Sequence, residues 1–420
     1  MMITRTKAIY LDYASLTPVD PRVQKVINQY SVLEYSNPSS IYKTGLEAKK
    51  ALEYCREIAA ESIGAHPDEM IFTAGGTEAN NIAILGAIEN LRIQGIKYGD
   101  MHVLASAFEH SSVLECFKHL GTLGVQVEFI NIDSNGIISL DDLKKKLRPN
   151  TVFVSVMTVN NEIGTVQPVR EVARIIRNYR SSIELTDVRD LSTTADLPSF
   201  CSAKVGRLLS SADAGTRVLK YPLFHTDAAQ ASLLDLNVEK LGVDMLTLDG
   251  SKVYGPRGIG CLYVKRNTSL SPIIHGGGQE KGLCSGTENI PAIMGFARAL
   301  DIAKEEREEE IKRLTILREL FISKLKTVRA DIIIHGQSAL VSPHILNISI
   351  PGINNELFLL RLDARGVEVS TKSSCLGDQD ESYALKAIGA DSKTALRFSF
   401  GRWTKERDID KTIKVIGDIF

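Results

Sequence analysis

The chain has 420 residues, which at roughly 150 residues per domain predicts two or three domains. Lys and Arg together number 50, Asp and Glu 51, and the net charge of -1 argues against a nucleic-acid-binding protein, which usually presents a basic face. The sequence has no run of about 18 apolar residues, and residues 1–10 lack the apolar core of a signal peptide. We therefore expect neither a membrane span nor a secreted protein.

Six cysteines are scattered along the chain, and no two of them form a C-x-x-C pair. This spacing disfavours a zinc ribbon or a thioredoxin-like motif, and we expect no metal site. Scattered thiols in a chain without a secretion signal are typical of a reducing compartment, so the predicted location is the cytoplasm.

Short β-rich runs alternate with helical patterns from about residue 70 to residue 265. Strands are expected at residues 102–106, 125–130, 152–159, 223–226, 245–248 and 260–264, and helices at residues 78–91, 112–120, 141–147 and 169–179. This alternation predicts an α/β fold with a mostly parallel sheet covered by helices on both faces. Ligands of such sheets bind at the carboxyl ends of the strands.

Residues 181–220 interrupt the alternation. The preceding helix should lead back to the sheet within a few residues, but this stretch is rich in Ser, Thr and Asp and has weak periodicity. We interpret it as an insertion. It is either a tolerated surface loop or a segment that docks a partner or covers the site.

The pattern changes again near residue 300. Residues 301–328 form one long helical pattern, and its charged stretch is most simply a solvated face. Strands are then expected at residues 345–350, 367–371 and 395–400, and helices at 355–365, 381–388 and the C-terminal end. The sequence predicts a large domain at residues 16–300 and a smaller α+β domain at residues 301–420, joined by an N-terminal segment at residues 1–15.

The first motif with candidate chemistry is TAGGTEAN at residues 73–80, which follows a β-like pair and opens a helix. Gly75 and Gly76 let backbone amides approach a ligand closely, and Thr77 adds a hydroxyl group. Because a helix N-terminus is partially positive, these features predict an anion cradle. Alternatively, Thr77 only caps the helix.

Two further motifs follow predicted strands. HTDAAQ at residues 225–230 places Asp227 at the end of a buried strand, where a carboxylate is costly unless paired. A cationic ring nitrogen of a cofactor is one good partner, and the start of the next helix is another. SKVYGPRGIG at residues 251–260 places Lys252 at the same edge, where a desolvated lysine becomes a nucleophile, although most lysines are merely solvated.

Together these motifs supply a phosphate cradle, an acid for a pyridinium nitrogen and an amine for an aldehyde, the parts that a pyridoxal phosphate enzyme requires. With them the chain resembles the cysteine desulfurases of the class V aminotransferase group, from YLDYA at residues 10–14 to GRWT at residues 401–404. The resemblance implies a fold-type I architecture with a sheet of the seven-stranded type, pyridoxal 5'-phosphate as cofactor and L-cysteine as substrate.

The resemblance also implies roles for residues around the cofactor ring. Lys252 matches the lysine that bonds to the cofactor and later takes the α-proton of the substrate, and Asp227 matches the partner of the pyridine nitrogen. His110 matches a catalytic histidine that stacks on the ring. Gln230 and Asn161 match residues near the phenolic oxygen and the substrate.

Four residues correspond to phosphate ligands of the family. Gly76 and Thr77 belong to the cradle, and Ser251 can donate a hydrogen bond. Thr287 matches a threonine that reaches the phosphate of the neighbouring subunit, so the resemblance implies a homodimer.

Two residues of the C-terminal part match the substrate machinery. Arg397 corresponds to the clamp on the substrate carboxylate, a role that suits bidentate guanidinium geometry. Cys375 corresponds to the nucleophile that takes sulfur from L-cysteine, which leaves L-alanine and a persulfide. The sulfur then passes to an acceptor protein for iron–sulfur cluster assembly or tRNA thiolation.

Taken singly, these residues have ordinary interpretations. His110 alone is more often a helix cap or a core histidine, Asn161 a turn residue and Thr287 a turn hydroxyl. Arg397 alone is typical of a structural ion pair, and Cys375 of an inert thiol.

The phosphate site departs from the family pattern. The residues before the lysine usually read Ser-x-His, and here they read Asp249, Gly250 and Ser251, while Cys284 stands where an Arg is usual. A carboxylate close to a phosphate dianion is unfavourable, so we expect Asp249 to point away or to pair with a cation.

The sequence predicts an active cysteine desulfurase. One alternative is another class V enzyme such as a selenocysteine lyase. A second is a weakened paralogue that acts as an interaction protein through residues 181–220. The chain retains the matched lysine, aspartate, glutamine, arginine and cysteine. A paralogue that had lost the activity would retain all five only by chance, so their presence favours the enzyme.

Overall fold

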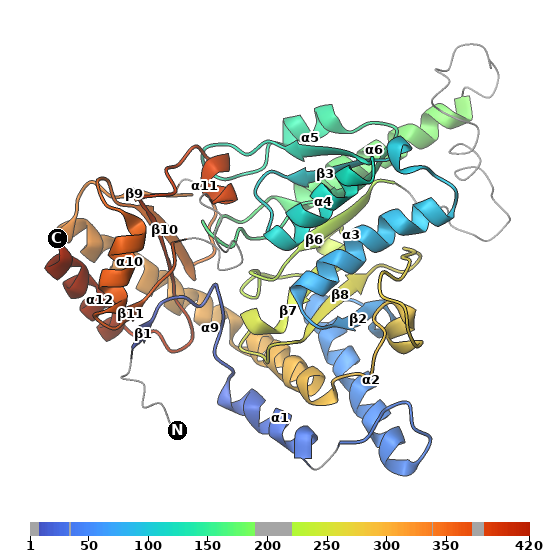
Figure 1. The fold of residues 1–420 in the computed structure, drawn as a ribbon, viewed down its shortest axis with the longest axis horizontal. Helices are drawn as coiled ribbons and strands as arrows, with labels where there is room; N and C mark the ends of the chain where they lie inside the picture. Colours follow the sequence, from blue (N-terminus) through green and yellow to red (C-terminus); the bar gives the residue numbers. More distant parts are fainter. Residues whose placement is uncertain (1–7, 33–34, 190–220, 338, 372–381) are drawn as a thin grey trace.

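The computed structural model describes residues 8–32, 35–189, 221–337, 339–371 and 382–420. Figure 1 shows a large sheet with its helices and, beside it, a smaller group of strands and helices that carries the C-terminus. The long helix α9 (Ile290–Val328) runs from one group to the other. No helix within the described residues is long and apolar enough to cross a membrane.

The large sheet has seven strands in the order β2-β8-β7-β6-β5-β3-β4. Their bounds are β2 (Met70–Thr73), β3 (His102–Ser106), β4 (Gln126–Ile130), β5 (Thr151–Ser155), β6 (Leu223–Asp227), β7 (Met245–Asp249) and β8 (Gly260–Val264). Strand β8 is antiparallel to β2 and β7, and the pairs from β7 to β4 are parallel. The expected α/β fold with a mostly parallel, seven-stranded sheet is confirmed.

Helices cover both faces of this sheet. Alternate strand residues pack on opposite faces, so that Val103 and Phe153 belong to one cluster while Leu104 and Val154 belong to the other. The helices α3 (Gly76–Ile93) and α4 (Ser111–Thr122) cover the first face. The second face is covered by α2 (Lys43–Ile63), α5 (Leu140–Lys146), α6 (Val169–Arg189), α8 (Val238–Leu241) and the first turns of α9. Burial on both sides explains why these strands read as apolar runs.

The C-terminal group is built on a small antiparallel sheet of β12 (Ala395–Ser399), β10 (Ile345–Ser349) and β9 (Ile333–Ile334). A second, parallel pair joins β1 (Ile9–Tyr10) to β11 (Val367–Glu368). The remaining helices are α10 (Asn355–Asp363), α11 (Tyr383–Ala387) and α12 (Glu406–Ile419), and α1 (Pro21–Val32) packs on α9. The N-terminal strand therefore belongs to the C-terminal group.

Helix α9 differs most from the expected elements. It starts at Ile290 rather than at residue 301, because the Asn289 side chain caps it by accepting from the Ala292 amide at 3.2 Å. Its first turns pack in the core of the large sheet and its last turns, from Leu314 on, in the core of the C-terminal group. The expected boundary at residue 300 thus falls inside one continuous helix.

Other elements also depart from the sequence expectations. Helix α6 continues to Arg189, so the first part of the expected insertion is helical, and residues 190–220 lie outside the described residues. Strand β11 stops at Glu368, short of the expected end at residue 371. Strands β1 and β9 have two residues each, which is too short for a period-two pattern to reveal.

A buried ion pair ties helix α2 to the segment that precedes α9. The guanidinium of Arg56 donates to both carboxylate oxygens of Glu280, at 2.8 and 2.7 Å, and Glu280 also accepts from the Phe72 amide of β2 at 2.8 Å. Because both side chains are buried, the pair fixes the path of residues 279–289, which carry Cys284 and Thr287.

We expect Glu280→Gln to lower the free energy of unfolding by about 3 kcal/mol, because Arg56 then stays buried without an opposite charge. Denaturant unfolding measures this loss. Asp68→Asn is the matched control, since it breaks the exposed pair with Arg266 and should cost less than about 1 kcal/mol. Equal losses in the two variants would contradict the importance of the buried pair.

Candidate active site

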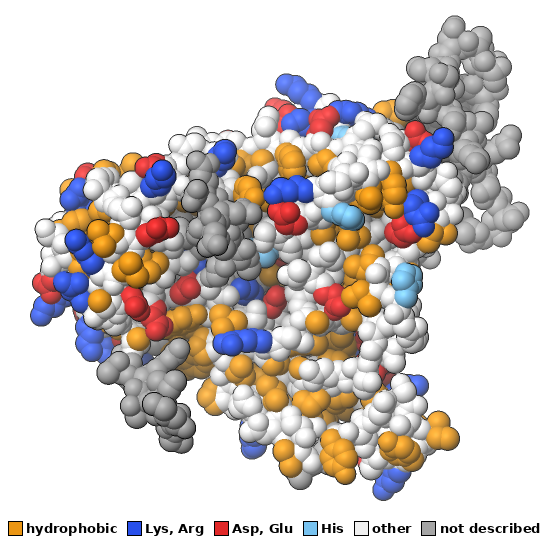
Figure 2. All heavy atoms as spheres, in the orientation of Figure 1, with side chains coloured by type: hydrophobic (Ala, Val, Ile, Leu, Met, Phe, Trp, Pro, Cys, Tyr) orange, Lys and Arg blue, Asp and Glu red, His pale blue; other side chains and the backbone are white. Residues whose placement is uncertain are grey.

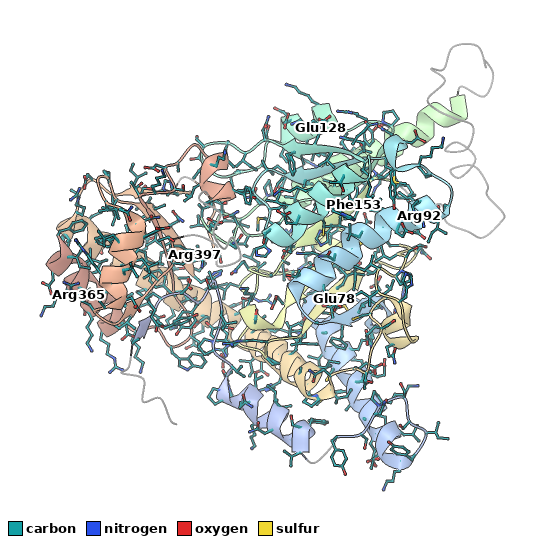
Figure 3. All side chains as sticks on the ribbon, viewed as in Figure 1. Glu78, Arg92, Glu128, Phe153, Arg365 and Arg397 are labelled. Atoms are coloured by element: carbon teal, nitrogen blue, oxygen red, sulfur yellow. The ribbon has the colours of Figure 1, made fainter. Side chains whose placement is uncertain are left out.

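The predicted site residues gather at the carboxyl ends of β6 and β7. These strands are parallel and in register, with Asp227 opposite Thr247, so their ends reach the same edge of the sheet. The N-termini of α3 and α4 lie at this edge as well, since side chains of both helices are linked to Asp227 by hydrogen bonds. Figure 3 shows Arg397 between the large sheet and the C-terminal group, with Glu78 at the start of α3.

A chain of hydrogen bonds connects Asp227 with His110. Asn80 of α3 donates from Nδ2 to Oδ2 of Asp227 and to Oγ of Ser112, each at 2.8 Å. The Ser112 hydroxyl in turn lies 2.8 Å from Nδ1 of His110. The carboxylate and the imidazole, far apart in sequence, therefore belong to one network. Asn80 lies at its centre, a role that the motif at residues 73–80 does not by itself predict.

The ordinary interpretation of His110 as a helix cap is also confirmed. It is the N-cap residue of α4, and its Nδ1 accepts from the Ser112 amide at 3.2 Å. Asp227 accepts from the Ala229 amide at 2.9 Å in a turn, but it caps no helix, because the next described helix starts at Val238 and is capped by Asn237. The helix-cap interpretation of Asp227 is therefore wrong.

Lys252 and Gln230 converge on the N-terminal segment. Nζ of Lys252 donates to the carbonyl oxygens of Ala14, at 3.1 Å, and Ser15. Nε2 of Gln230 donates to the same Ala14 oxygen at 2.8 Å. The two side chains thus lie within reach of one atom, as expected for residues that share a ligand. His344 contributes a further contact, since its Nε2 lies 3.2 Å from Oε1 of Gln230.

Arg397 is the largest fully buried side chain of the described residues, with 1% of its surface exposed. Its guanidinium donates to Oδ1 of Asp12 at 2.8 Å, to Oγ of Ser15 at 2.6 Å and to the carbonyl oxygen of Asn161 at 2.8 Å. Nε has no hydrogen-bond partner within the described residues. The structural ion pair is confirmed, and one buried donor is left for a ligand.

Asn161 lies in a turn, as its ordinary interpretation predicts, and is buried beside Arg397. Asp12, by contrast, has a role that the sequence analysis does not predict. Its position in a segment of otherwise apolar and small residues was the available signal, since a partly buried carboxylate also requires a partner.

The Gly76 amide of the predicted anion cradle already holds an anion, a carboxylate of the chain itself. Helix α3 is preceded by Gly75, whose φ of +149° favours glycine, and no side chain caps it, so the interpretation of Thr77 as a cap is wrong. The Gly76 amide donates to Oδ2 of Asp249 at 3.0 Å. The Ser251 amide and hydroxyl donate to Oδ1 at 2.8 and 2.6 Å.

The expectation for Asp249 is therefore wrong. It neither points away from the cradle nor pairs with a cation, because two of the residues predicted to bind phosphate, Gly76 and Ser251, donate hydrogen bonds to it. A helix N-terminus attracts an anion, and in this chain the nearest anion is the residue at the end of β7.

Two of the remaining predicted residues, Thr77 and Thr287, are exposed and make no side-chain hydrogen bond with the other described site residues. Thr77 lies in the first turn of α3, and Thr287 lies before α9. Cys284 is half-buried with Sγ 3.3 Å from Oε2 of Glu78, and burial together with the nearby carboxylates raises the pKa of this thiol to about 12. Cys375 lies outside the described residues.

Glu109 is a buried acid that the sequence analysis did not assign. It accepts from the Met157 amide at 2.8 Å and from the Ser106 hydroxyl, while its other oxygen has no partner among the described residues. Burial raises the pKa of Glu109 to about 8, and the charge of nearby Asp227 acts in the same direction. The carboxyl group of Glu109 is therefore mostly protonated at neutral pH.

This assignment predicts how stability depends on pH. The unfolded chain loses the Glu109 proton near the ordinary value of 4.5 and the folded chain near 8, so folded protein binds more protons in between and loses stability as pH rises through that window. In Glu109→Gln the free energy of unfolding should therefore fall less between about pH 5 and pH 8 than it does in the parent protein, by about 1 kcal/mol or more.

Urea unfolding at both pH values measures the difference. Glu115→Gln, at an exposed site on α4, is the control and should keep the pH dependence of the parent protein. An unchanged pH dependence in Glu109→Gln would contradict the raised pKa.

Comparison with known protein families identifies the family to which this chain belongs. The model of the class-V aminotransferase family matches residues 9–189 and 206–412. The chain belongs to this family. The break between the two matched ranges lies within residues 181–220, the stretch interpreted as an insertion.

Named relatives cover nearly the whole chain. Cysteine desulfurase IscS of Dictyoglomus turgidum is 36% identical and is matched over 98% of this chain and 94% of its own length. Among solved structures, a NifS-like protein superposes with a TM-score of 0.82 at 31% identity, over 98% of this chain and 99% of its own. SspA in complex with cysteine superposes with a TM-score of 0.74 at 29% identity, over 93% and 98%. The resemblance to cysteine desulfurases is confirmed.

Class-V aminotransferase-family enzymes use pyridoxal 5'-phosphate, and the described residues fit this group. Asp227 offers a buried carboxylate to a ring nitrogen, and Lys252 offers an amine to an aldehyde. Oδ1 of Asn80, which is buried beside Asp227, has no partner among the described residues, as expected where a ligand completes the site. The Gly76 amide at the start of α3 holds a carboxylate, which shows that this amide binds an anion.

Proposed function

We propose that this protein is a pyridoxal phosphate-dependent cysteine desulfurase, which converts L-cysteine to L-alanine and places the sulfur on Cys375. The observation that carries the proposal is the convergence of Lys252, Gln230 and Arg397 on residues 12–15. It brings a nucleophilic amine, an amide donor and a carboxylate clamp to one edge of the sheet. Full-length similarity to cysteine desulfurases, and to a protein solved with cysteine, supports it.

Each side of the site would hold a different part of the cofactor. Asp227, held by Asn80, would keep a proton on the ring nitrogen, and Gln230 would donate to the phenolic oxygen. His110, anchored by Ser112, would face the ring. When bound, pyridoxal phosphate withdraws electrons from the Cα atom of an attached amino acid.

The substrate would be held through its carboxylate. Arg397 is fixed by Asp12 and the Asn161 carbonyl, so its planar guanidinium is oriented before a substrate arrives. Lys252 would take the Cα proton on Nζ, because it lies at the same edge of the sheet and is only half-buried.

The thiolate of Cys375 would attack the substrate sulfur. An S–S bond forms, the Cβ–S bond breaks, and its electron pair stays with the carbon, which takes up a proton and leaves as L-alanine. The persulfide on Cys375 is then passed to the thiol of an acceptor protein, for iron–sulfur cluster assembly or tRNA thiolation. We propose no direct role for nucleic acid or membrane.

The protein is proposed to act as a homodimer in the cytoplasm. Figure 2 shows hydrophobic side chains gathered over α1 and the start of α2, and the exposed ones there include Ile41, Tyr42 and Leu46. Exposed apolar surface of this kind is typical of a protein–protein interface. The thiol state of the described cysteines agrees with a reducing compartment.

We expect Cys375→Ala to lose protein-bound sulfur and to form L-alanine about 10²-fold more slowly, while it still binds the cofactor. The measurement uses ³⁵S-labelled L-cysteine, followed by peptide mapping of the label. Cys284→Ala is the control and should keep the label, since its thiol is held protonated beside Glu78. Protein-bound label that persists in Cys375→Ala would contradict the assignment of Cys375 as the nucleophile.

A further inference from the structure

Asp249 stands at a sequence position where members of the family usually have a residue that binds the cofactor phosphate. Its two carboxylate oxygens take three hydrogen bonds, one from the Gly76 amide at 3.0 Å and two from Ser251 at 2.8 and 2.6 Å. A side-chain Cβ added at Gly76 would lie 3.0 Å from Oδ2 of Asp249, so the carboxylate sits directly against the first turn of α3.

This arrangement engages the Gly76 amide of the cradle and both donors of Ser251 without an external ligand. The amides of a helix N-terminus and a neighbouring hydroxyl bind phosphate because they present several donors to one anion. Here one such amide, that of Gly76, and the amide and hydroxyl of Ser251 already face a carboxylate that is tethered to β7, at no cost in lost translational freedom. A phosphate dianion would have to displace Asp249 and then remain close to its charge.

A second carboxylate belongs to the same turn but not to the cradle. Glu78 accepts from the Ala74 amide at 2.5 Å and contacts Cys284. It makes none of the contacts that Asp249 makes with Gly76 and Ser251. Substitutions of the two acids therefore distinguish a general effect of negative charge near the helix from direct hydrogen bonding to the predicted phosphate donors.

We infer that Asp249 acts as an internal substitute for phosphate and sets the ligand specificity of the site. It lowers the preference of this protein for pyridoxal phosphate over unphosphorylated pyridoxal. The inference rests on the proposed function, since both compounds are held by bonding to Lys252.

The test compares two affinities in each protein. Apoprotein is titrated with pyridoxal phosphate and with pyridoxal, and binding is followed by the absorbance of the lysine-bound form, which Lys252→Ala must abolish. Asp249→Ser should raise the affinity ratio of phosphate to non-phosphate form by about tenfold to hundredfold, the value of a regained hydrogen bond to a charged group. Its affinity for pyridoxal should stay unchanged.

Two further variants keep the test decisive if Asp249→Ser is poorly folded. Asp249→Asn preserves the shape and one acceptor oxygen but removes the charge, and it should raise the ratio in the same direction. Glu78→Gln removes a charge from the same helix turn and should change the ratio by less than about fivefold.

The outcomes distinguish the two claims. A ratio that is unchanged in both Asp249 variants, or that rises equally in Glu78→Gln, overturns the inference and leaves the proposed function intact. Absence of a Lys252-dependent signal with either compound in every protein overturns the proposed function, and the inference with it.

Discussion

The whole site depends on one short stretch of backbone, the segment from Asp12 to Thr17. At its start, the Ala14 amide donates to Ser399 of β12, which anchors the segment on the C-terminal group. At its end, Thr17 exchanges hydrogen bonds with the segment after β7, accepting from the Tyr254 amide and donating to the Ser251 carbonyl. The segment therefore fastens the C-terminal group to the edge of the large sheet where the cofactor would lie.

This constraint explains how residues more than a hundred positions apart become one site. Arg397 arrives on β12 and Lys252 follows β7, and both are positioned by bonds to Asp12, Ala14 and Ser15. The side chains that hold substrate and cofactor share a single scaffold, so a shift of the segment would move them together. Helix α9, which is buried in both cores, limits such shifts.

Charge in the site is distributed in an unusual way. Burial raises the pKa of Glu109, and the charge of Asp227 adds to that effect, so Glu109 carries its proton at neutral pH. At the phosphate end of the site, the carboxylate of Asp249 accepts hydrogen bonds from Gly76 and Ser251, two of the predicted phosphate ligands. The chain thus combines a ring site that fits the family with a phosphate site in which an internal anion competes.

The sequence alone predicted the parallel sheet, since buried strands and helix periodicity are local signals, but the strand expected at residues 152–159 ends at Ser155. It also singled out Asp227, Lys252 and Arg397. It missed Asn80 and Asp12, because their roles arise from contacts across long sequence separations that no local pattern encodes. The position of Asp249 escaped prediction for the same reason, because its hydrogen bond with the Gly76 amide joins residues 173 positions apart.

L-Alanine formation from L-cysteine tests the central claim most directly. The assay contains added pyridoxal phosphate and a reductant, beside a Lys252→Ala control that keeps the fold. The account predicts alanine from the parent protein and none above background from the control. A folded parent protein that binds the cofactor through Lys252 and yet forms no alanine from L-cysteine would contradict it.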